Sequence, residues 1–272
     1  MEQSVGTAAG ACLEQRRHTL AGVTRDERES AWRRHQRHEF HQPSPDLAPH
    51  VARYWVVEWR YDRPYRQLIV PYPNVHLTFH AGGASVTGVS SGHVVKELDG
   101  TGRVFGVAFR PGAFRPFLRA PVQSITDRSA PAATLFDHLP AHADLDSVEH
   151  VLRRALPEPD PRSRQAVEVV DRIVGDPALT RVDALAREVG GSVRGLQRLF
   201  AEHVGINPKW VIRRYRLHEV TERMRAGGRI DWAALAADLG YADQPHLVRD
   251  FTALFGETPT RYAERYSTST AT

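Results

Sequence analysis

The sequence lacks most of the features that mark secreted, membrane-spanning and catalytic proteins. Its one cysteine, Cys12, excludes an intrachain disulfide and a multi-cysteine metal site, and is expected to be a free thiol in a mobile tail. It contains no run of roughly eighteen apolar residues, and no apolar segment follows the N-terminal charges, so neither a membrane span nor a secretory signal is expected. Serine and cysteine triads, phosphate-cradling glycine loops and paired carboxylates do not stand out. These absences favour a cytoplasmic protein that is not an enzyme, has no cofactor or metal, and has no membrane partner.

What is present suits two globular domains. The chain has 272 residues, of which 41% are hydrophobic and 25% charged. A formal net charge of +4 favours polyanionic partners only slightly. Lysine and arginine strengthen nucleic-acid binding only where they reach phosphates, so the placement of the charges matters more than their sum.

The N-terminal half divides into a tail and a β-rich domain. Residues 1–37 are polar and predict a disordered or loosely helical tail. Residues 38–156 predict a β-rich domain for sensing or dimerisation, because short β-branched and aromatic runs alternate with turn residues; such spacing is typical of an antiparallel sandwich or small barrel. The expected strands are 54–61, 67–72, 75–80, 84–89, 93–98 and 103–109. Helical spacing at 132–139 and 145–156 predicts two helices that either pack on their own barrel or mediate self-association.

Two groups of side chains in this half are candidate sites. Aromatic residues could line a ligand pocket, although such residues are more often plain core; they are Tyr54, Trp55, Trp59 and Phe79. Imidazoles and a carboxylate at strand-like spacing could bind zinc or iron in an alternative, metal-dependent cupin-type enzyme fused to the C-terminal part, or could be outward-facing polar residues. They are His76, His80, His93 and Glu97.

Beyond a proline-rich linker at 157–162, every segment has helical periodicity and the chain repeats itself. Helices are expected at 163–176, with Ser163 as its N-cap, and at 182–190, 192–205 and 208–227. The residues Leu185, Ala186, Val189 and Gly190 recur as Leu235, Ala236, Leu239 and Gly240. After a one-residue slip, Leu196, Arg198, Phe200, Gly205, Pro208 and Tyr215 recur as Leu247, Arg249, Phe251, Gly256, Pro259 and Tyr266. The repeated unit is a helix, a glycine turn and a second helix ended by glycine, so two helix-turn-helix units are predicted.

The second helix of each unit carries polar residues near its start, where a recognition helix meets base edges. The candidates are Arg194, Gln197 and Arg198 in the first copy and Gln244, His246 and Arg249 in the second. Arginine can pair with guanine and glutamine with adenine, whereas a single unmatched helix with such residues is more often an ordinary solvated face. Asp243 is the expected N-cap of the second copy, and Pro245 fits its first turn.

The helix expected at 208–227 would join the two units. At 1.5 Å per residue it spans about 30 Å, close to the roughly 34 Å between successive turns of one DNA groove. Its apolar residues Trp210, Ile212, Leu217, Val220 and Met224 are expected in the core. Its arginines either reach phosphates or keep the helix soluble; they are Arg213, Arg214 and Arg216.

Residues 163–267, and above all the segment GYADQPHLVRDFTALFGETPTRY, resemble the DNA-binding domain of the AraC/XylS family of transcriptional regulators. The resemblance implies seven helices with two helix-turn-helix subdomains joined by a linker helix, double-stranded DNA as partner, and base contacts from the six candidates above. Pro245 stands where family members often carry another polar residue, and Gly195 offers no side chain. Residues 268–272 are expected to be a disordered tail.

The N-terminal half resembles, more weakly, the β-rich domain of some members of that family. The segments that carry this resemblance are YW, PYPNVHLTF and GVAFRPGAFRPFL. It implies an α+β protein whose cupin-like barrel senses a small-molecule effector or forms a homodimer. The identity of an effector does not carry over.

Overall fold

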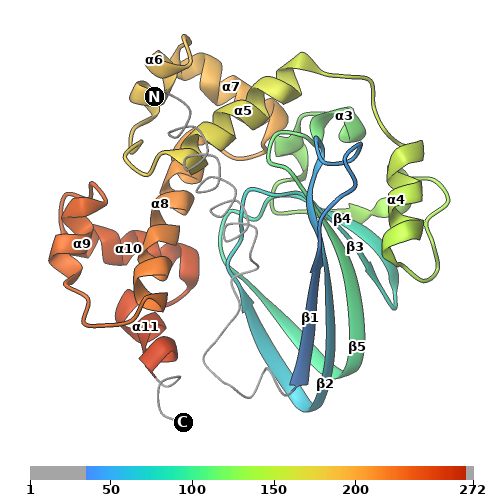
Figure 1. Cartoon of the computed structure of the whole chain (residues 1–272), viewed down its shortest axis with the longest axis horizontal. Helices are drawn as coiled ribbons and strands as arrows, with labels where there is room; N and C mark the ends of the chain where they lie inside the picture. The colour runs from blue at the N-terminus through green and yellow to red at the C-terminus, as the bar shows by residue number, and fades with distance from the viewer. Residues whose placement is uncertain (1–34, 268–272) are drawn as a thin grey trace, which may run out of the picture.

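The computed structural model describes residues 35–267, with side chains from residue 35 to residue 264. Most of the predicted tail, Cys12 and the expected disordered end at 268–272 lie outside the described residues. The described chain is a mixed α+β structure in which an antiparallel sheet is followed by a region of helices, as predicted (Figure 1). None of the described helices has the length and apolarity needed to cross a membrane.

The N-terminal part is built on one six-stranded antiparallel sheet with the strand order β1-β2-β5-β3-β4-β6. Its strands are β1 (Gln36–His41), β2 (Val51–Ile69), β3 (His76–His80), β4 (Gly83–Thr87), β5 (Val94–Phe109) and β6 (Ser129–Pro131). Strands β1 and β6 lie at opposite ends of this order and do not pair with each other in the described chain, so the sheet does not close into a barrel there.

Strands β2 and β5 differ from the four runs expected in their place. The runs 54–61 and 67–72 fall mostly in the single strand β2, and the runs 93–98 and 103–109 fall in the single strand β5. The register shifts between Tyr61 and Tyr65, so a bulge absorbs the residues expected to form a turn while pairing with β5 continues on both sides. The turn residues at 99–102 do not end the strand, because Gly100, Thr101 and Gly102 pair with β2. Strand β1 has no counterpart among the predicted runs and begins inside the predicted tail.

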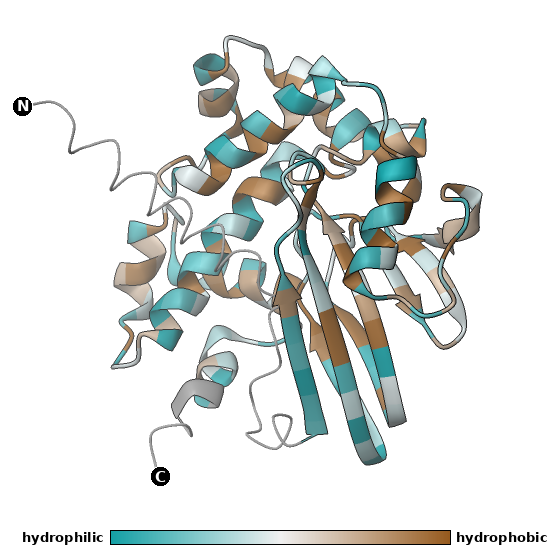
Figure 2. Cartoon of the chain, turned by 45° about the vertical axis from the view of Figure 1, so that its right-hand side comes forward, coloured by the Kyte–Doolittle hydropathy of each residue, from teal (hydrophilic) through white to brown (hydrophobic). Residues whose placement is uncertain are grey.

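The core lies on the face of the sheet that the helical segments cover. The buried side chains of this face alternate along β2, β3 and β5; they are Tyr54, Val56, Leu77, Phe79, Phe105 and Val107. A cluster of aromatic rings extends this core beyond the end of β5; it contains Phe109, Phe114, Phe117 and Phe136. Figure 2 shows hydrophobic residues on the half of the long strands nearer the helices and hydrophilic residues toward the far ends.

The expected helix at 132–139 is wrong. Only a single 3-10 turn, η2 (Ala132–Thr134), forms there, and His138 adopts a left-handed φ of 54° that ends regular structure. Phe136 packs into the aromatic cluster, and this tertiary contact accounts for the apolar residue that suggested a helix. The other short segments are α3 (Arg115–Leu118) and η1 (Val122–Ile125). Helix α4 (Leu145–Arg154) forms where expected, with Asp144 in a capping box.

Up to Ser267, where the described residues end, the C-terminal part consists of seven helices, which is the number that the family resemblance implied. They are α5 (Pro161–Gly175), α6 (Val182–Glu188), α7 (Val193–His203), α8 (Pro208–Arg225), α9 (Trp232–Asp238), α10 (Gln244–Phe255) and α11 (Pro259–Ser267). Helix α5 begins inside the predicted linker, and its N-cap is Asp160, which accepts from the amide of Arg162, rather than Ser163. The proline at the first helical position allows the earlier start, because its missing amide hydrogen needs no partner there.

Candidate nucleic-acid interface

The first helix-turn-helix unit consists of α6 and α7. Gly190 adopts a left-handed φ of 66° between the two helices, and the amide of Gly191 returns to the carbonyl of Ala186 at 2.8 Å. Ser192 then caps α7 by accepting from the amide of Gly195 at 3.0 Å. The turn is therefore fixed by backbone geometry that the glycine makes available.

The second unit consists of α9 and α10 and repeats the first with a turn one residue longer. Gly240 has a φ of 69°, and the amide of Tyr241 reaches the carbonyl of Ala236 at 2.9 Å. Asp243 caps α10 by accepting from the amide of His246 at 2.7 Å, as predicted, and Pro245 lies in the first turn. The additional residue in this turn accounts for the one-residue shift in the alignment of the two copies.

Both second helices bury one face and expose their leading turns. In α7 the buried residues are Leu196, Leu199, Phe200 and His203, and in α10 they are Leu247, Phe251, Leu254 and Phe255. The predicted base-reading side chains of α7 all belong to exposed residues: Arg194, Gln197 and Arg198. In α10, Gln244 and Arg249 are exposed and the side chain of His246 is 44% exposed. The six candidates therefore lie on accessible faces of the two helices.

Helix α8 joins the two units and is the scaffold for both. Its 18 residues correspond to a length of about 27 Å. Side chains are buried around most of its circumference, as is typical of a helix with neighbours on several sides. The five residues predicted to be core all have exposed fractions of 5% or less: Trp210, Ile212, Leu217, Val220 and Met224. In Figure 1, α5, α6 and α7 lie at one end of α8 and α9, α10 and α11 at the other.

The prediction that Arg214 reaches phosphates is wrong. Its side chain is completely buried, with Nε donating to the carbonyl of Pro71 at 2.7 Å. Its guanidinium carbon lies 3.7 Å from the ring centre of Tyr72 and 5.6 Å from that of Phe255. Arg214 therefore joins the N-terminal part to the second unit. On a helix with one polar face, an arginine on the opposite face would be predicted to be buried. The charged residues of α8 lie on all sides of the helix, so the sequence does not single out Arg214 as a buried residue.

Arg213 and Arg216 also make contacts within the protein. Arg213 Nη1 lies 3.4 Å from a carboxylate oxygen of Asp250, and its side chain is 29% exposed. The guanidinium of Arg216 lies 4.0 Å from the ring centre of Tyr241. Both arginines connect the linker helix to the second unit, and phosphate contact by Arg213 would compete with its carboxylate partner.

The N-terminal part contacts α8 at two further points. The indole Nε1 of Trp210 donates to the carbonyl of Ser91 at 2.7 Å, and the hydroxyl of Tyr72 lies 3.1 Å from Nδ1 of the buried His218. Sequence reasoning assigned no role to Tyr72 or Ser91. Tyr72 lies in the segment PYPNVHLTF, but the resemblance that this segment carries implies no contact with α8, and Ser91 belongs to no recognisable motif.

The first unit makes its own contacts with the N-terminal part. Arg115 pairs with Glu202 at 2.6 Å, and the hydroxyl of Thr126 donates to the carbonyl of Gly205. Arg110 pairs with Asp171 of α5, also at 2.6 Å. The sheet domain therefore touches the first unit directly and the linker helix along its length.

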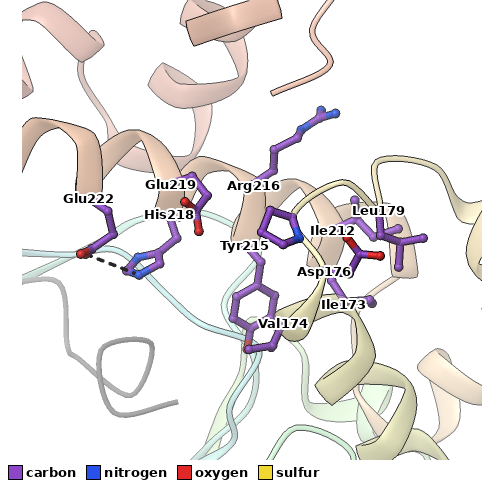
Figure 3. A pocket seen from close by; sticks show the side chains of 11 residues that line it. Ile173, Val174, Asp176, Leu179, Ile212, Tyr215, Arg216, His218, Glu219 and Glu222 are labelled. Carbon is purple, nitrogen blue, oxygen red and sulfur yellow. Dashed lines mark ion pairs between the residues drawn. The ribbon is translucent and has the colours of Figure 1, made fainter. Parts of the chain in front are cut away.

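A cavity of about 240 Å³ opens between the end of α5 and the linker helix. Its apolar residues include Ile173, Val174 and Ile212, and Glu219 and Glu222 come from α8. Figure 3 shows the His218–Glu222 ion pair on one side of this cavity and Arg216 directed away from it. Burial raises the pKa of Tyr215, so its phenol stays neutral.

The four aromatic residues predicted to line one pocket do not share a face of the sheet. Tyr54 and Phe79 point into the core, each within about 6.3 Å of the ring of Phe105. Trp55 and Trp59 lie on the other face, over Gly106 and Gly102, where a β-carbon would come within 2.1 Å of either indole. The prediction of a single pocket is wrong, because residues of opposite parity on β2 point to opposite faces.

The four candidate metal ligands are dispersed. His76 packs edge-on against Trp55, and burial lowers its pKa to about 4. His80 accepts from the amide of Gly82 at its own hairpin, and His93 lies against Gly256 at the end of α10. Within residues 35–264, no three histidine, cysteine, aspartate or glutamate side chains group as metal ligands would.

Comparisons with known proteins match the two parts separately. Residues 185–265 match a helix-turn-helix domain, and residues 39–131 match a domain of unknown function (DUF6597). No curated protein matches the sequence.

The fold is similar to solved structures of ToxT from Vibrio cholerae. ToxT from the O395 strain is 8% identical with a TM-score of 0.40, over 86% of this chain and 99% of that one. ToxT from strain SCE256, bound to an unsaturated fatty acid, is 11% identical with a TM-score of 0.36, over 76% and 93%. At these identities and TM-scores, the likeness to ToxT supports no conclusion about the function of this chain.

Proposed function

We propose that this chain, whose residues 185–265 are a helix-turn-helix domain of the AraC type, is a cytoplasmic, sequence-specific DNA-binding regulator of transcription. Its partner would be double-stranded DNA, which α7 and α10 would read in two successive segments of the major groove. The base contacts would come from Arg194, Gln197 and Arg198 and from Gln244, His246 and Arg249.

One observation carries this proposal: two capped helices expose polar leading turns from one rigid scaffold. Ser192 and Asp243 are the N-caps at equivalent positions of the repeat, so α7 and α10 begin in the same way. The linker helix between them is about 27 Å long, and the repeat of the DNA groove is roughly 34 Å. Bidentate arginine and glutamine contacts at such positions discriminate between bases by about 1–3 kcal/mol each.

We infer that the N-terminal part controls this DNA-binding part through the linker helix. A change in the sheet domain that displaced Tyr72 would release Arg214 and His218 on α8, and both units are attached to α8. Either a small-molecule effector or homodimerisation through the N-terminal part could supply that change. The effector is not assigned to the four predicted aromatic residues, because they lie on two faces.

Selection of bound sequences from random DNA tests the main proposal. The full chain should enrich one sequence with two half-sites about one helical turn apart, and its affinity should fall steeply with salt concentration. Arg194→Ala should relax the preference at one base pair of one half-site, whereas Arg37→Ala, which removes an equal charge from the exposed edge of the sheet, should not. Failure of the unmodified chain to enrich any sequence would refute the proposal.

Control by an effector or by dimerisation needs separate measurements. A metabolite that binds only the folded protein must raise its unfolding temperature, so thermal unfolding against a metabolite panel finds an effector. Sedimentation over a range of protein concentrations finds a dimer. If no metabolite has an effect and the protein stays monomeric, the N-terminal part acts by another route.

A further inference from the structure

The carboxylate of Asp250 lies between the linker helix and the exposed face of the second unit. One of its oxygens is 3.4 Å from Nη1 of Arg213 on α8, and the other is 3.9 Å from Nε2 of His246 one turn earlier on α10. The Asp250 side chain is only 18% exposed, whereas that of His246 is 44% exposed. Asp250 therefore sits behind His246, toward the scaffold, where it does not itself face the groove.

A buried aromatic ring restrains His246 from a second direction. The imidazole meets the ring of Tyr241 edge to face, with centroids 5.2 Å apart and planes at 85°. Tyr241 is 6% exposed and is held in turn by the guanidinium of Arg216 over its ring. Burial raises the pKa of Tyr241 to about 12, so it stays uncharged. His246 is therefore placed by two residues that are each tied to an arginine of the linker helix.

The first unit has no equivalent of this arrangement. With Arg198 aligned on Arg249, Asp250 falls on Leu199 and His246 on Gly195. Leu199 is 8% exposed and packs in the core, and Gly195 has no side chain to orient. The contact of Asp250 with Arg213 and His246 therefore has no counterpart at the aligned positions of the first unit. The helix-turn-helix fold that the two units share does not itself require this contact.

The partial exposure of Arg213 and Asp250 limits how much stability their pair supplies. A partly solvated ion pair contributes less than a buried one, and removing it leaves no fully buried charge behind. Loss of the Asp250 charge should therefore leave α10 folded while releasing His246 from one of its two restraints. A base contact depends on side-chain position to within a fraction of an ångström, so such a release is expected to matter for recognition.

We propose that Asp250 is a positioning residue that sets base preference at the second half-site without touching DNA. It does so by holding His246 against Tyr241 and by fixing α10 to Arg213 of the linker helix. This inference rests on the proposed function, since it assigns a role within the DNA-reading surface of the second unit.

The test compares Asp250→Asn, which keeps the size of the side chain and removes its charge, with Asp238→Asn, which removes an equal charge from the exposed end of α9. Both full-length variants and the unmodified chain are titrated with the selected DNA and with copies altered at single base pairs of each half-site. Asp250→Asn should reduce discrimination by about 3- to 10-fold at the base pair that is also sensitive to His246→Ala, and leave the first half-site unaffected. Asp238→Asn should match the unmodified chain.

A double-substitution cycle separates positioning from general damage. If Asp250 acts through His246, then Asp250→Asn should have little further effect on discrimination in a chain that already carries His246→Ala. Equal weakening on all DNA copies, a changed preference at both half-sites, or additive effects of the two substitutions would each overturn the proposal. A failure of the proposed function would look different, because the unmodified chain would then show no preference to lose.

Discussion

The two helix-turn-helix units share a backbone plan but take their orientation from different parts of the molecule. The first unit is held by the N-terminal part itself, through the Arg115–Glu202 pair and the contact of Thr126 with Gly205. The second unit is held by the linker helix, through Arg213, Arg216 and Arg214. A signal in the sheet domain would therefore reach the first unit directly and the second mainly through α8, apart from the contact of His93 with Gly256 at the end of α10.

The exposed polar residues proposed to contact bases also differ between α7 and α10. The aligned positions of α7 and α10 pair Arg194 with Pro245 and Gln197 with Val248, so the second unit lacks two of the polar side chains of the first. In their place it has Gln244 and His246, which align with Val193 and Gly195, and His246 is placed by contacts that the first unit lacks. The comparison suggests a first unit that reads by three exposed side chains and a second in which one of the three is pre-positioned.

Arg214 joins the N-terminal part to the linker helix and the second unit, and its removal should have the largest effect. Arg214→Ala deletes a buried hydrogen bond and a buried ring contact and leaves a cavity, so the free energy of unfolding should fall by about 3 kcal/mol. Arg213→Ala, which removes a 29% exposed side chain from the next position, should cost less than about 1 kcal/mol. Urea unfolding of the two variants makes the comparison, and equal losses would mean that Arg214 is not the central attachment.

The next effect concerns base preference. Arg194→Ala and Gln197→Ala should each lower discrimination at the first half-site by about 2 kcal/mol, because their exposed side chains can form bidentate contacts. Gln244→Ala and His246→Ala should each cost about 1 kcal/mol at the second half-site, since Gln244 is at the first helical position and one imidazole offers fewer contacts. Titration of all four variants on one operator shows which unit contributes more to base discrimination. A larger loss of discrimination from Gln244→Ala and His246→Ala than from Arg194→Ala and Gln197→Ala would contradict the prediction.

The repeat made the C-terminal part predictable from sequence, whereas the contacts between the two parts were not. Local signals fix the caps at Ser192 and Asp243, the glycine turns at Gly190 and Gly240, and the buried stripes, because each depends on residues within a few positions of one another. The burial of Arg214 depends on Pro71 and Tyr72, more than 140 positions earlier, and the sequence alone contains no sign of that proximity. For the same reason, the pairing across the turn signal in β5 overrode a sound local prediction.

A glycine comparison tests whether the first unit is held directly. Gly205 has a φ of 91°, and a β-carbon there would lie 2.9 Å from a methyl of Val122, whereas Gly190, at 66°, has open space. Gly190→Ala should cost about 1 kcal/mol for its left-handed backbone, and Gly205→Ala about 1 kcal/mol more, because it also presses on the N-terminal part. Equal unfolding free energies for the two variants would show that the side chain of Val122 moves aside without a measurable loss of stability.

The smallest effect is the contribution of one buried histidine of the first unit, His203, to the pH dependence of unfolding. Burial lowers the pKa of His203, although the carboxylates of Asp160 and Glu202 oppose the change; Arg115 and Arg162 act in the same direction as burial. Its Nδ1 lies 3.1 Å from the hydroxyl of Ser163 at the start of α5. Because the unfolded chain binds this proton more readily than the folded one, the contribution of His203 is present above the ordinary pKa of 6.5 and is lost as the pH falls below it. His203→Gln should therefore flatten the decline in unfolding free energy between about pH 7 and pH 5, a range above the usual pKa of the aspartates. Urea unfolding across this pH range makes the measurement, and an unchanged slope for the variant would mean that burial of His203 does not disfavour its protonated form.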